Sequence, residues 1–204
     1  RAVAIPALVT ALRPRQWAKN LLVIAAPFAA GRLLEQAVAI EVAVAFVAFC
    51  LASSAVYLLN DVRDAAQDRL HPEKKNRPIA SGRVTPITAV LVAVVALVAS
   101  LALSMLAEPA LLWVIATYLV LQLLYVFWLK NQPVLDLAVV ASGFLLRALA
   151  GGAATDIAIS DWFLLVAGFG SLFVVAGKRY SELVMLETEQ AEVGATRSSL
   201  LSYT

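Results

Sequence analysis

The chain has 204 residues, of which 62% are hydrophobic and 15% charged, and its formal net charge is +2. Soluble domains are about half apolar and about one quarter charged, so this composition excludes an ordinary soluble enzyme and predicts an integral membrane protein. Glycines number only 9 and strand-like alternation is absent. We therefore expect an all-α, polytopic transmembrane helical bundle and not a β-barrel.

Six apolar segments are predicted to span the membrane. Residues 1–20 precede them as a basic interfacial segment, and the first span, at 17–31, is short and contains Pro27. The other spans each approach the ~20 residues that cross a ~30 Å hydrocarbon core. They are expected at residues 42–59, 87–106, 110–129, 134–154 and 162–177. Glu108 and Pro109 predict a tight turn, and the tail is expected to be mostly helical up to Gly194.

Charges divide unequally between the two sides that alternating spans would create. The N-terminus, the 60–86 loop, the 130–133 turn and the tail carry almost all the lysines and arginines. The opposite side has only Arg32, together with several acidic residues. The positive-inside rule therefore predicts that the basic side faces the cytoplasm.

An acidic face follows the second predicted span. With Asp61 at zero and 100° per residue, Asp64 falls at about 300°, Asp68 at about 340° and Asn60 at about 260°. Three carboxylates on one helix face repel each other unless a cation neutralises them. Mg²⁺ suits this set, because it binds one or two carboxylates together with substrate phosphates.

The cations after this face fit the same chemistry. Lys74, Lys75 and Arg77 follow the acids closely and can close over phosphate oxygens. This pattern predicts a site for a diphosphate leaving group. The alternative is a solvated loop with helix-end charges of both signs.

Two charged residues lie inside the fifth predicted span. Asp136 and Arg147 are eleven residues apart, close to one helix face. A charge at mid-bilayer costs roughly 2.5–3.5 kcal/mol, so such groups usually face a bundle interior or cavity. Arg147 could equally be a structural partner of another helix. Tyr125 and Lys130 close the fourth span, where both are also ordinary interfacial anchors.

These motifs resemble the UbiA superfamily of intramembrane prenyltransferases. The resemblance rests on Asn60-Asp61-x-x-Asp64-x-x-x-Asp68 and on "NRPIASG" at 76–82. Three segments, "LRPRQWAKNLLVIAAP", "LDLAVVASGFLLRALAGG" and "GKRYSEL", resemble its actinobacterial branch of decaprenyl-phosphate phosphoribosyltransferases. Ordinary members have a second acidic motif, whereas the matching residues 178–182 here hold two cations and one acid. This departure favours a phosphate-rich second substrate over a prenyl diphosphate donor.

The resemblance implies both a fold and a reaction. It implies nine transmembrane helices around a central cavity, of which residues 1–204 would supply about six in a single membrane domain, ending before the last three. The reaction would be Mg²⁺-dependent transfer of 5-phosphoribosyl from phosphoribosyl diphosphate to decaprenyl (polyprenyl) phosphate, for cell-wall arabinan precursor synthesis. The implied location is the bacterial plasma membrane, with the active site on the cytoplasmic side.

The resemblance also implies roles for particular residues. Asn60, Asp61, Asp64 and Asp68 would bind the metal, with the three aspartates and Glu182 as the catalytic set. Gln16, Lys19 and Asn20 would bind the lipid phosphate. Further substrate-binding residues would be Lys74, Lys75, Arg77, Tyr125, Lys130, Asp136, Arg147, Lys178, Arg179 and Tyr180. The expected partners are the two substrates and the lipid bilayer, without nucleic acid, and a homo-oligomer stays open.

Two other functions remain open from the sequence. A prenyltransferase that moves a polyprenyl chain from its diphosphate to an aromatic or other small acceptor would use the same acidic face. A membrane transporter would use Asp136 and Arg147 as part of a substrate path. The second function leaves the acidic face without a purpose.

Overall fold

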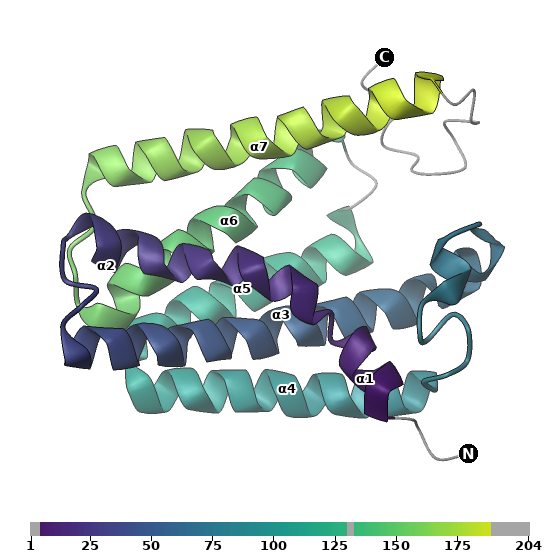
Figure 1. Ribbon diagram of the computed structural model, residues 1–204, viewed down its shortest axis with the longest axis horizontal. Coiled ribbons are helices and arrows are strands. Elements are labelled where there is room, and N and C mark those ends of the chain that lie inside the picture. Colours follow the sequence, from purple (N-terminus) through teal and green to yellow (C-terminus); the bar gives the residue numbers. More distant parts are fainter. Residues whose placement is uncertain (1–4, 130–132, 189–204) are drawn as a thin grey trace.

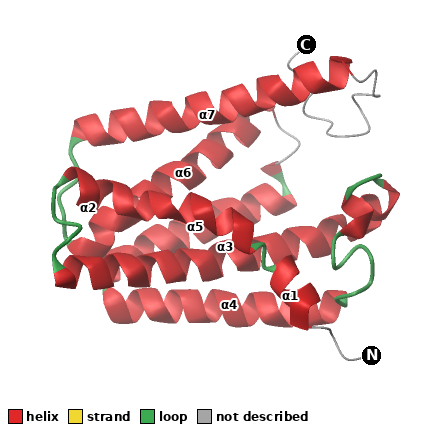
Figure 2. Ribbon diagram, in the orientation of Figure 1, coloured by secondary structure: helices red, strands yellow, loops and turns green. Residues whose placement is uncertain are grey.

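The computed structural model describes residues 5–129 and 133–188, and this described part contains helices and no strands (Figures 1 and 2). The all-α prediction is confirmed. In chain order the elements are α1 (Ile5–Ala11), η1 (Pro14–Ile24), α2 (Ala25–Ala29), α3 (Gln36–Leu70), η2 (Lys74–Asn76), α4 (Pro86–Ala107), α5 (Pro109–Phe127), α6 (Pro133–Thr155) and α7 (Asp161–Thr188).

Five described helices, α3 to α7, are long and apolar enough to cross a membrane. They correspond to the second to sixth predicted spans, except that α5 ends at Phe127, two residues before the predicted end at 129. α3 continues through the acidic face as predicted. The first predicted span differs, because residues 14–29 form the 3₁₀ helix η1 followed by the short helix α2. The interfacial segment is also divided, since α1 ends at Ala11, before Pro14 opens η1. The predicted end of the tail helix at Gly194 lies outside the described residues.

Local sequence explains the hairpin of α4 and α5. Pro86 occupies the first turn of α4, where a missing N–H costs nothing, and the Thr85 side chain accepts a hydrogen bond from the Thr88 N–H. Glu108 is extended between the two helices (φ −153°), and Pro109 begins α5. The predicted Glu108–Pro109 turn is confirmed.

Two apolar clusters hold the bundle together. The first joins η1, α3, α5 and α6, where Phe49 packs with Tyr118 at a ring-centroid distance of 5.1 Å. The second joins α1, α3, α4 and the 78–84 loop around Leu58, Ile79 and Val84. Each of these three side chains is at most 1% exposed. The loop after the acidic face is therefore anchored in the core and is not simply a solvated connection.

η1 follows a three-residue period. Side chains three apart eclipse one another in a 3₁₀ helix. Asn20 and Val23 are consequently both buried on one side of η1. Gly151 of α6 lies beneath this side, because a Cβ at Gly151 would come within 1.9 Å of the Val23 carbonyl oxygen. Only glycine permits this close approach of η1 to α6.

The segments that carry most of the cations meet at one end of the bundle. The turn after α1, which holds Arg13, the loop containing η2 and the C-terminal end of α7 lie toward the right in Figure 1. The turns after α2 and between α6 and α7 lie at the opposite end. This arrangement agrees with the alternating directions that were predicted for the spans.

Candidate active site

The predicted acidic face forms an ion-pair cluster at the end of α3. Arg77 Nη1 donates to Asp68 Oδ2 at 2.8 Å and contacts Asp61 Oδ1 at 3.3 Å. Arg13 Nη2 donates to the same Asp61 oxygen at 2.5 Å. The side chains of Asp61 and Asp68 are only 3% and 6% exposed. We call Arg13, Asp61, Asp68 and Arg77 the acid–arginine cluster.

The other members of the acidic face lie beside this cluster. Asn60 and Asp64 are half-buried on the same end of α3, whereas Arg63 is exposed and lies over the Phe127 ring at 5.5 Å. Arg63 therefore points away from the acids.

The donor set fits Mg²⁺ bound together with a phosphorylated substrate. Within residues 5–129 and 133–188, no three carboxylate, imidazole or thiol side chains lie close enough to hold a metal ion by themselves. Mg²⁺ does not need such a cage, since it takes one or two carboxylates, substrate phosphates and several waters. Asp61 and Asp68 already converge on one guanidinium group. Asn60 and Asp64 would be the neighbouring oxygen donors.

The loop of residues 71–85, which we call the basic loop, is shaped by side chains that were not predicted for the site. His71 Nδ1 accepts hydrogen bonds from the backbone N–H groups of Glu73 and Lys74 at 3.2 and 3.4 Å. Arg83 Nη2 donates to the Asn76 carbonyl at 2.6 Å, and Arg69 Nε donates to the Ala80 carbonyl at 3.1 Å. Of the predicted phosphate ligands on this loop, Lys74 is half-buried and Lys75 is exposed.

A second buried ion pair connects α6 with α7. Asp136 is fully buried and accepts hydrogen bonds from Arg179 Nε at 2.8 Å and Arg179 Nη2 at 3.2 Å. The Tyr125 hydroxyl of α5 donates to Asp136 Oδ1 at 2.8 Å. Three residues predicted for the site from separate spans are therefore in direct contact.

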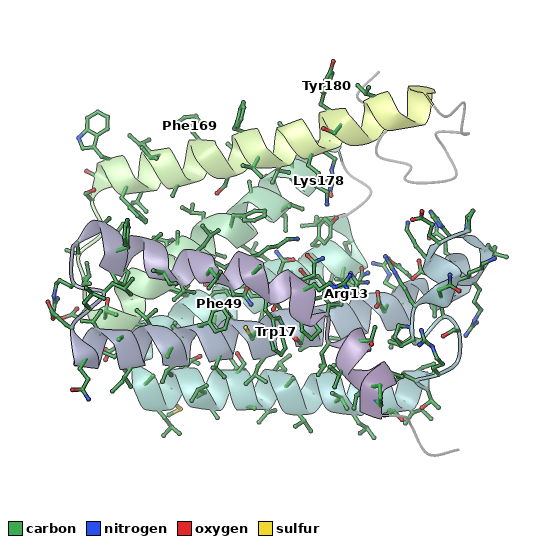
Figure 3. The ribbon with its side chains drawn as sticks, in the orientation of Figure 1. Arg13, Trp17, Phe49, Phe169, Lys178 and Tyr180 are labelled. Carbon is green, nitrogen blue, oxygen red and sulfur yellow. The ribbon has the colours of Figure 1, made fainter. Side chains whose placement is uncertain are left out.

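The α7 segment presents its predicted site residues in different directions. Lys178 points toward the bundle, and Tyr180 points away from it with 70% of its surface exposed (Figure 3). Residues two positions apart on an α-helix point about 200° away from each other, so Lys178 and Tyr180 cannot share a face. A substrate-binding role for Tyr180 stays a prediction. Glu182 lies on α7, but its side chain is outside the described part, as is Lys130.

Asn20 and Arg147 bind each other in the interior. Arg147 Nε donates to Asn20 Oδ1 at 2.7 Å, Nη1 to the Gly143 carbonyl at 2.6 Å and Nη2 to the Tyr118 hydroxyl at 3.0 Å. Asn20 is 0% exposed, and its amide also donates to Cys50 Sγ and Ser53 Oγ. Arg147 was predicted either to face a cavity or to bind another helix, and the structure shows contacts that join its helix to η1 and α5. A substrate role for either residue stays a prediction.

An apolar groove runs between η1, α6 and α7. Its volume is about 570 Å³, and its lining includes Leu22, Phe144, Phe163 and Val174. Lys19 is the one charged residue among the described side chains that line it. The Lys19 side chain is half-buried. The groove thus combines apolar walls with one positively charged side chain.

Known proteins share much of this sequence. The sequence profile of the UbiA prenyltransferase family matches residues 21–196. Decaprenyl-phosphate phosphoribosyltransferase of Mycolicibacterium smegmatis is 53% identical over 204 residues, covering 98% of this chain and 63% of that protein. The Corynebacterium glutamicum protein of the same name is 52% identical over 202 residues, covering 97% of this chain and 60% of the relative.

Solved structures show the same fold. A UbiA homolog from Archaeoglobus fulgidus, bound to GPP and Mg²⁺, superposes with a TM-score of 0.74 at 18% identity, over 94% of this chain and 67% of that one. The present chain therefore spans about three fifths to two thirds of the length of these relatives. From the profile match and these identities, the chain belongs to the UbiA prenyltransferase family.

Proposed function

We propose that the protein transfers a 5-phosphoribosyl group from phosphoribosyl diphosphate to a polyprenyl phosphate and releases diphosphate. The observation that carries this proposal is the buried acid–arginine cluster at the bundle end where the basic loop also lies. Relatives with 52–53% identity over nearly the whole chain are named for this reaction. The acidic motif at 60–68 suits a diphosphate, and the two cations Lys178 and Arg179 suit a phosphate-rich donor.

Bond exchange takes place at the ribose anomeric carbon. An oxygen of the lipid phosphate forms a bond to C1 while the C1–O bond to diphosphate breaks. The lipid phosphate is already an anion, so the reaction needs no strong general base. The transition state resembles an oxocarbenium ion, and the protein's main tasks are to orient two anions and to stabilise the leaving group.

The residues divide these tasks between them. Asp61 and Asp68, with Asn60 and Asp64, would hold Mg²⁺, which would neutralise charge on the departing diphosphate. Lys74, Lys75 and Arg77 would contact phosphate oxygens from the basic loop. Arg77 contacts both carboxylates of the cluster, which supports a role for its guanidinium group in binding the diphosphate beside the acids.

The lipid substrate would enter from the side of the groove. Lys19 on the wall and Lys178 on the inward side of α7 supply positive charge for its phosphate. The apolar lining suits an isoprenoid chain. The Asp136–Arg179 pair fixes α7 against α6, which sets the direction of Lys178. In this arrangement the catalytic end lies on the cytoplasmic side of a bacterial plasma membrane.

A donor-consumption assay tests the proposal. Membranes that contain the full-length protein are given labelled phosphoribosyl diphosphate or labelled prenyl diphosphate, with polyprenyl phosphate and Mg²⁺. We expect consumption of phosphoribosyl diphosphate and loss of activity by about 10²-fold or more in Asp68→Asn. Glu41→Gln, a half-buried carboxylate near the opposite end of α3, is the matched control and should retain activity. Consumption of prenyl diphosphate alone would instead favour the aromatic prenyltransferase.

A further inference from the structure

We propose that Arg13 is part of the donor site, where it serves in turn as the counter-ion of Asp61 and as a ligand of a substrate phosphate. Before substrate binds, its guanidinium group occupies the Asp61 oxygen that a divalent cation would use. When the cation and the diphosphate enter, Arg13 exchanges the carboxylate for a phosphate oxygen. Naming the phosphate as that of phosphoribosyl diphosphate rests on the proposed function.

The contact between Arg13 and Asp61 joins distant parts of the chain. The residues are 48 positions apart, and Arg13 lies in the turn between α1 and η1. The Asp61 side chain is 3% exposed, whereas that of Arg13 is 25% exposed. The guanidinium group also lies over the Tyr57 ring at 5.0 Å. Arg13 thus reaches the buried carboxylate from a position that remains open on one side.

The turn that carries Arg13 has an unusual backbone. Arg13 adopts the left-handed conformation (φ 55°, ψ 56°) immediately before Pro14. A non-glycine residue in this region costs roughly 1–2 kcal/mol and persists only where surrounding contacts hold it. Ser54 Oγ donates to the Leu12 carbonyl at 2.9 Å and accepts from Trp17 Nε1 at 3.0 Å. These bonds clamp both sides of the turn to α3.

Charge balance predicts that Arg13 leaves Asp61 for a phosphate when a divalent cation binds. In the acid–arginine cluster two carboxylates contact two guanidinium groups. A divalent cation at Asp61 would face two positive groups at short range, which is unfavourable in a partly buried site. A bound diphosphate supplies new negative charge to the arginines after the cation has taken their carboxylate partner. Guanidinium groups bind phosphate oxygens with favourable two-pronged geometry.

An anchoring role for Arg13 makes a different prediction. If the ion pair only attached α1 to α3, its removal would lower stability and leave metal affinity equal or weaker. If Arg13 competes with the cation, its removal strengthens metal binding and weakens donor binding. The opposite signs of these two effects separate the roles.

The experiment measures both effects on purified full-length protein in detergent. Mn²⁺ binding without substrate is followed by electron paramagnetic resonance, and the KM for phosphoribosyl diphosphate is measured separately. We expect Arg13→Gln to bind Mn²⁺ about tenfold more tightly and to raise the donor KM by about tenfold. Arg13→Lys keeps the positive charge and should retain the wild-type Mn²⁺ affinity, but its single ammonium group should still raise the donor KM.

Arg15→Gln is the matched control, because Arg15 is exposed two residues away and should change neither quantity. Thermal melting and size-exclusion chromatography establish that each variant is folded. If Arg13→Gln fails to fold, an Arg13→Lys protein with a normal donor KM overturns the proposal. Unchanged or weaker Mn²⁺ binding in folded Arg13→Gln also overturns it, as does a lack of Mn²⁺ binding in both wild type and variant. Failure of the wild type to consume phosphoribosyl diphosphate would overturn the proposed function, while the Mn²⁺ comparison would still decide the role of Arg13.

Discussion

At Asp61 a nearly buried carboxylate lies between two arginines from different segments, one before α3 and one after it. The helix periodicity predicted that Asp61 and Asp68 would share a face and require positive charge, and the structure places Arg77 against both. The part played by Arg13 was not predicted. Its partner lies 48 residues away, and no local pattern encodes that distance.

Arg147 illustrates a residue whose surroundings only the structure defines. The free-energy cost of placing a charged side chain in the bilayer predicted that Arg147 would avoid lipid, and it is 5% exposed. Its three hydrogen-bond partners come from η1, α5 and its own helix. Phe49, Tyr118 and Phe144 surround the guanidinium group at 4.9–6.0 Å. These contacts attach the 3₁₀ helix to the bundle.

We predict that Arg147→Met lowers the free energy of unfolding by about 1–3 kcal/mol, because the buried Asn20 oxygen loses its donor. Asn20→Leu should cost a similar amount. The double variant should cost less than the sum, since neither partner is then left unpaired. Chemical denaturation in detergent measures these values, and Arg32→Gln, in an exposed pair with Glu35, is the control. Unchanged stability with a raised KM for polyprenyl phosphate would contradict the structural role.

Among the elements, η1 departs most from what the sequence predicted. A membrane span of ordinary α-helix was expected from residue 17, and its residues would drift around the axis by 100° each. In the 3₁₀ helix Lys19 and Leu22 instead share one side, where both line the groove. The Asn20–Val23 side packs on Gly151. Tertiary packing thus determines which residues of this segment line the groove.

Gly151→Ala should destabilise the contact between η1 and α6. The added methyl group would lie 1.9 Å from the Val23 carbonyl oxygen and 3.0 Å from Pro27 Cδ. We expect a loss of about 1–3 kcal/mol or more in the free energy of unfolding, with a lower melting temperature. Gly168→Ala is the control, because a methyl group there meets nothing within 4 Å and alanine favours helix by about 1 kcal/mol. Equal melting temperatures for the two variants would show that η1 does not pack closely on α6.

For the whole molecule, the direction of each span brings the basic segments to one end. The turn after α1, the loop with η2 and the end of α7 are far apart in sequence but lie at the same end in Figure 1. The positive-inside rule then predicts that this end faces the cytoplasm. The single cysteine of the chain, Cys50, is buried, which simplifies a labelling test.

We predict that Lys75→Cys and Asp161→Cys react from opposite sides of the membrane. Both positions are exposed, in the η2 loop and at the start of α7 respectively. A membrane-impermeant maleimide should label Asp161→Cys in intact cells and Lys75→Cys only after the membrane is opened. Wild type is the control, since buried Cys50 should remain unlabelled in both conditions. Labelling of Lys75→Cys in intact cells would reverse the proposed orientation.

The sequence by itself determined the membrane class, the five long spans, the Glu108–Pro109 turn and the shared face of Asp61 and Asp68. These features depend on composition and on periodicity within one segment, which are local properties of the chain. Only the tertiary structure decided that Arg13 pairs with Asp61, that Asn20 pairs with Arg147 and that η1 adopts a 3₁₀ helix. Such features depend on which distant side chains and backbone atoms meet, because a buried charge or a close helix contact is stable only with its particular partner.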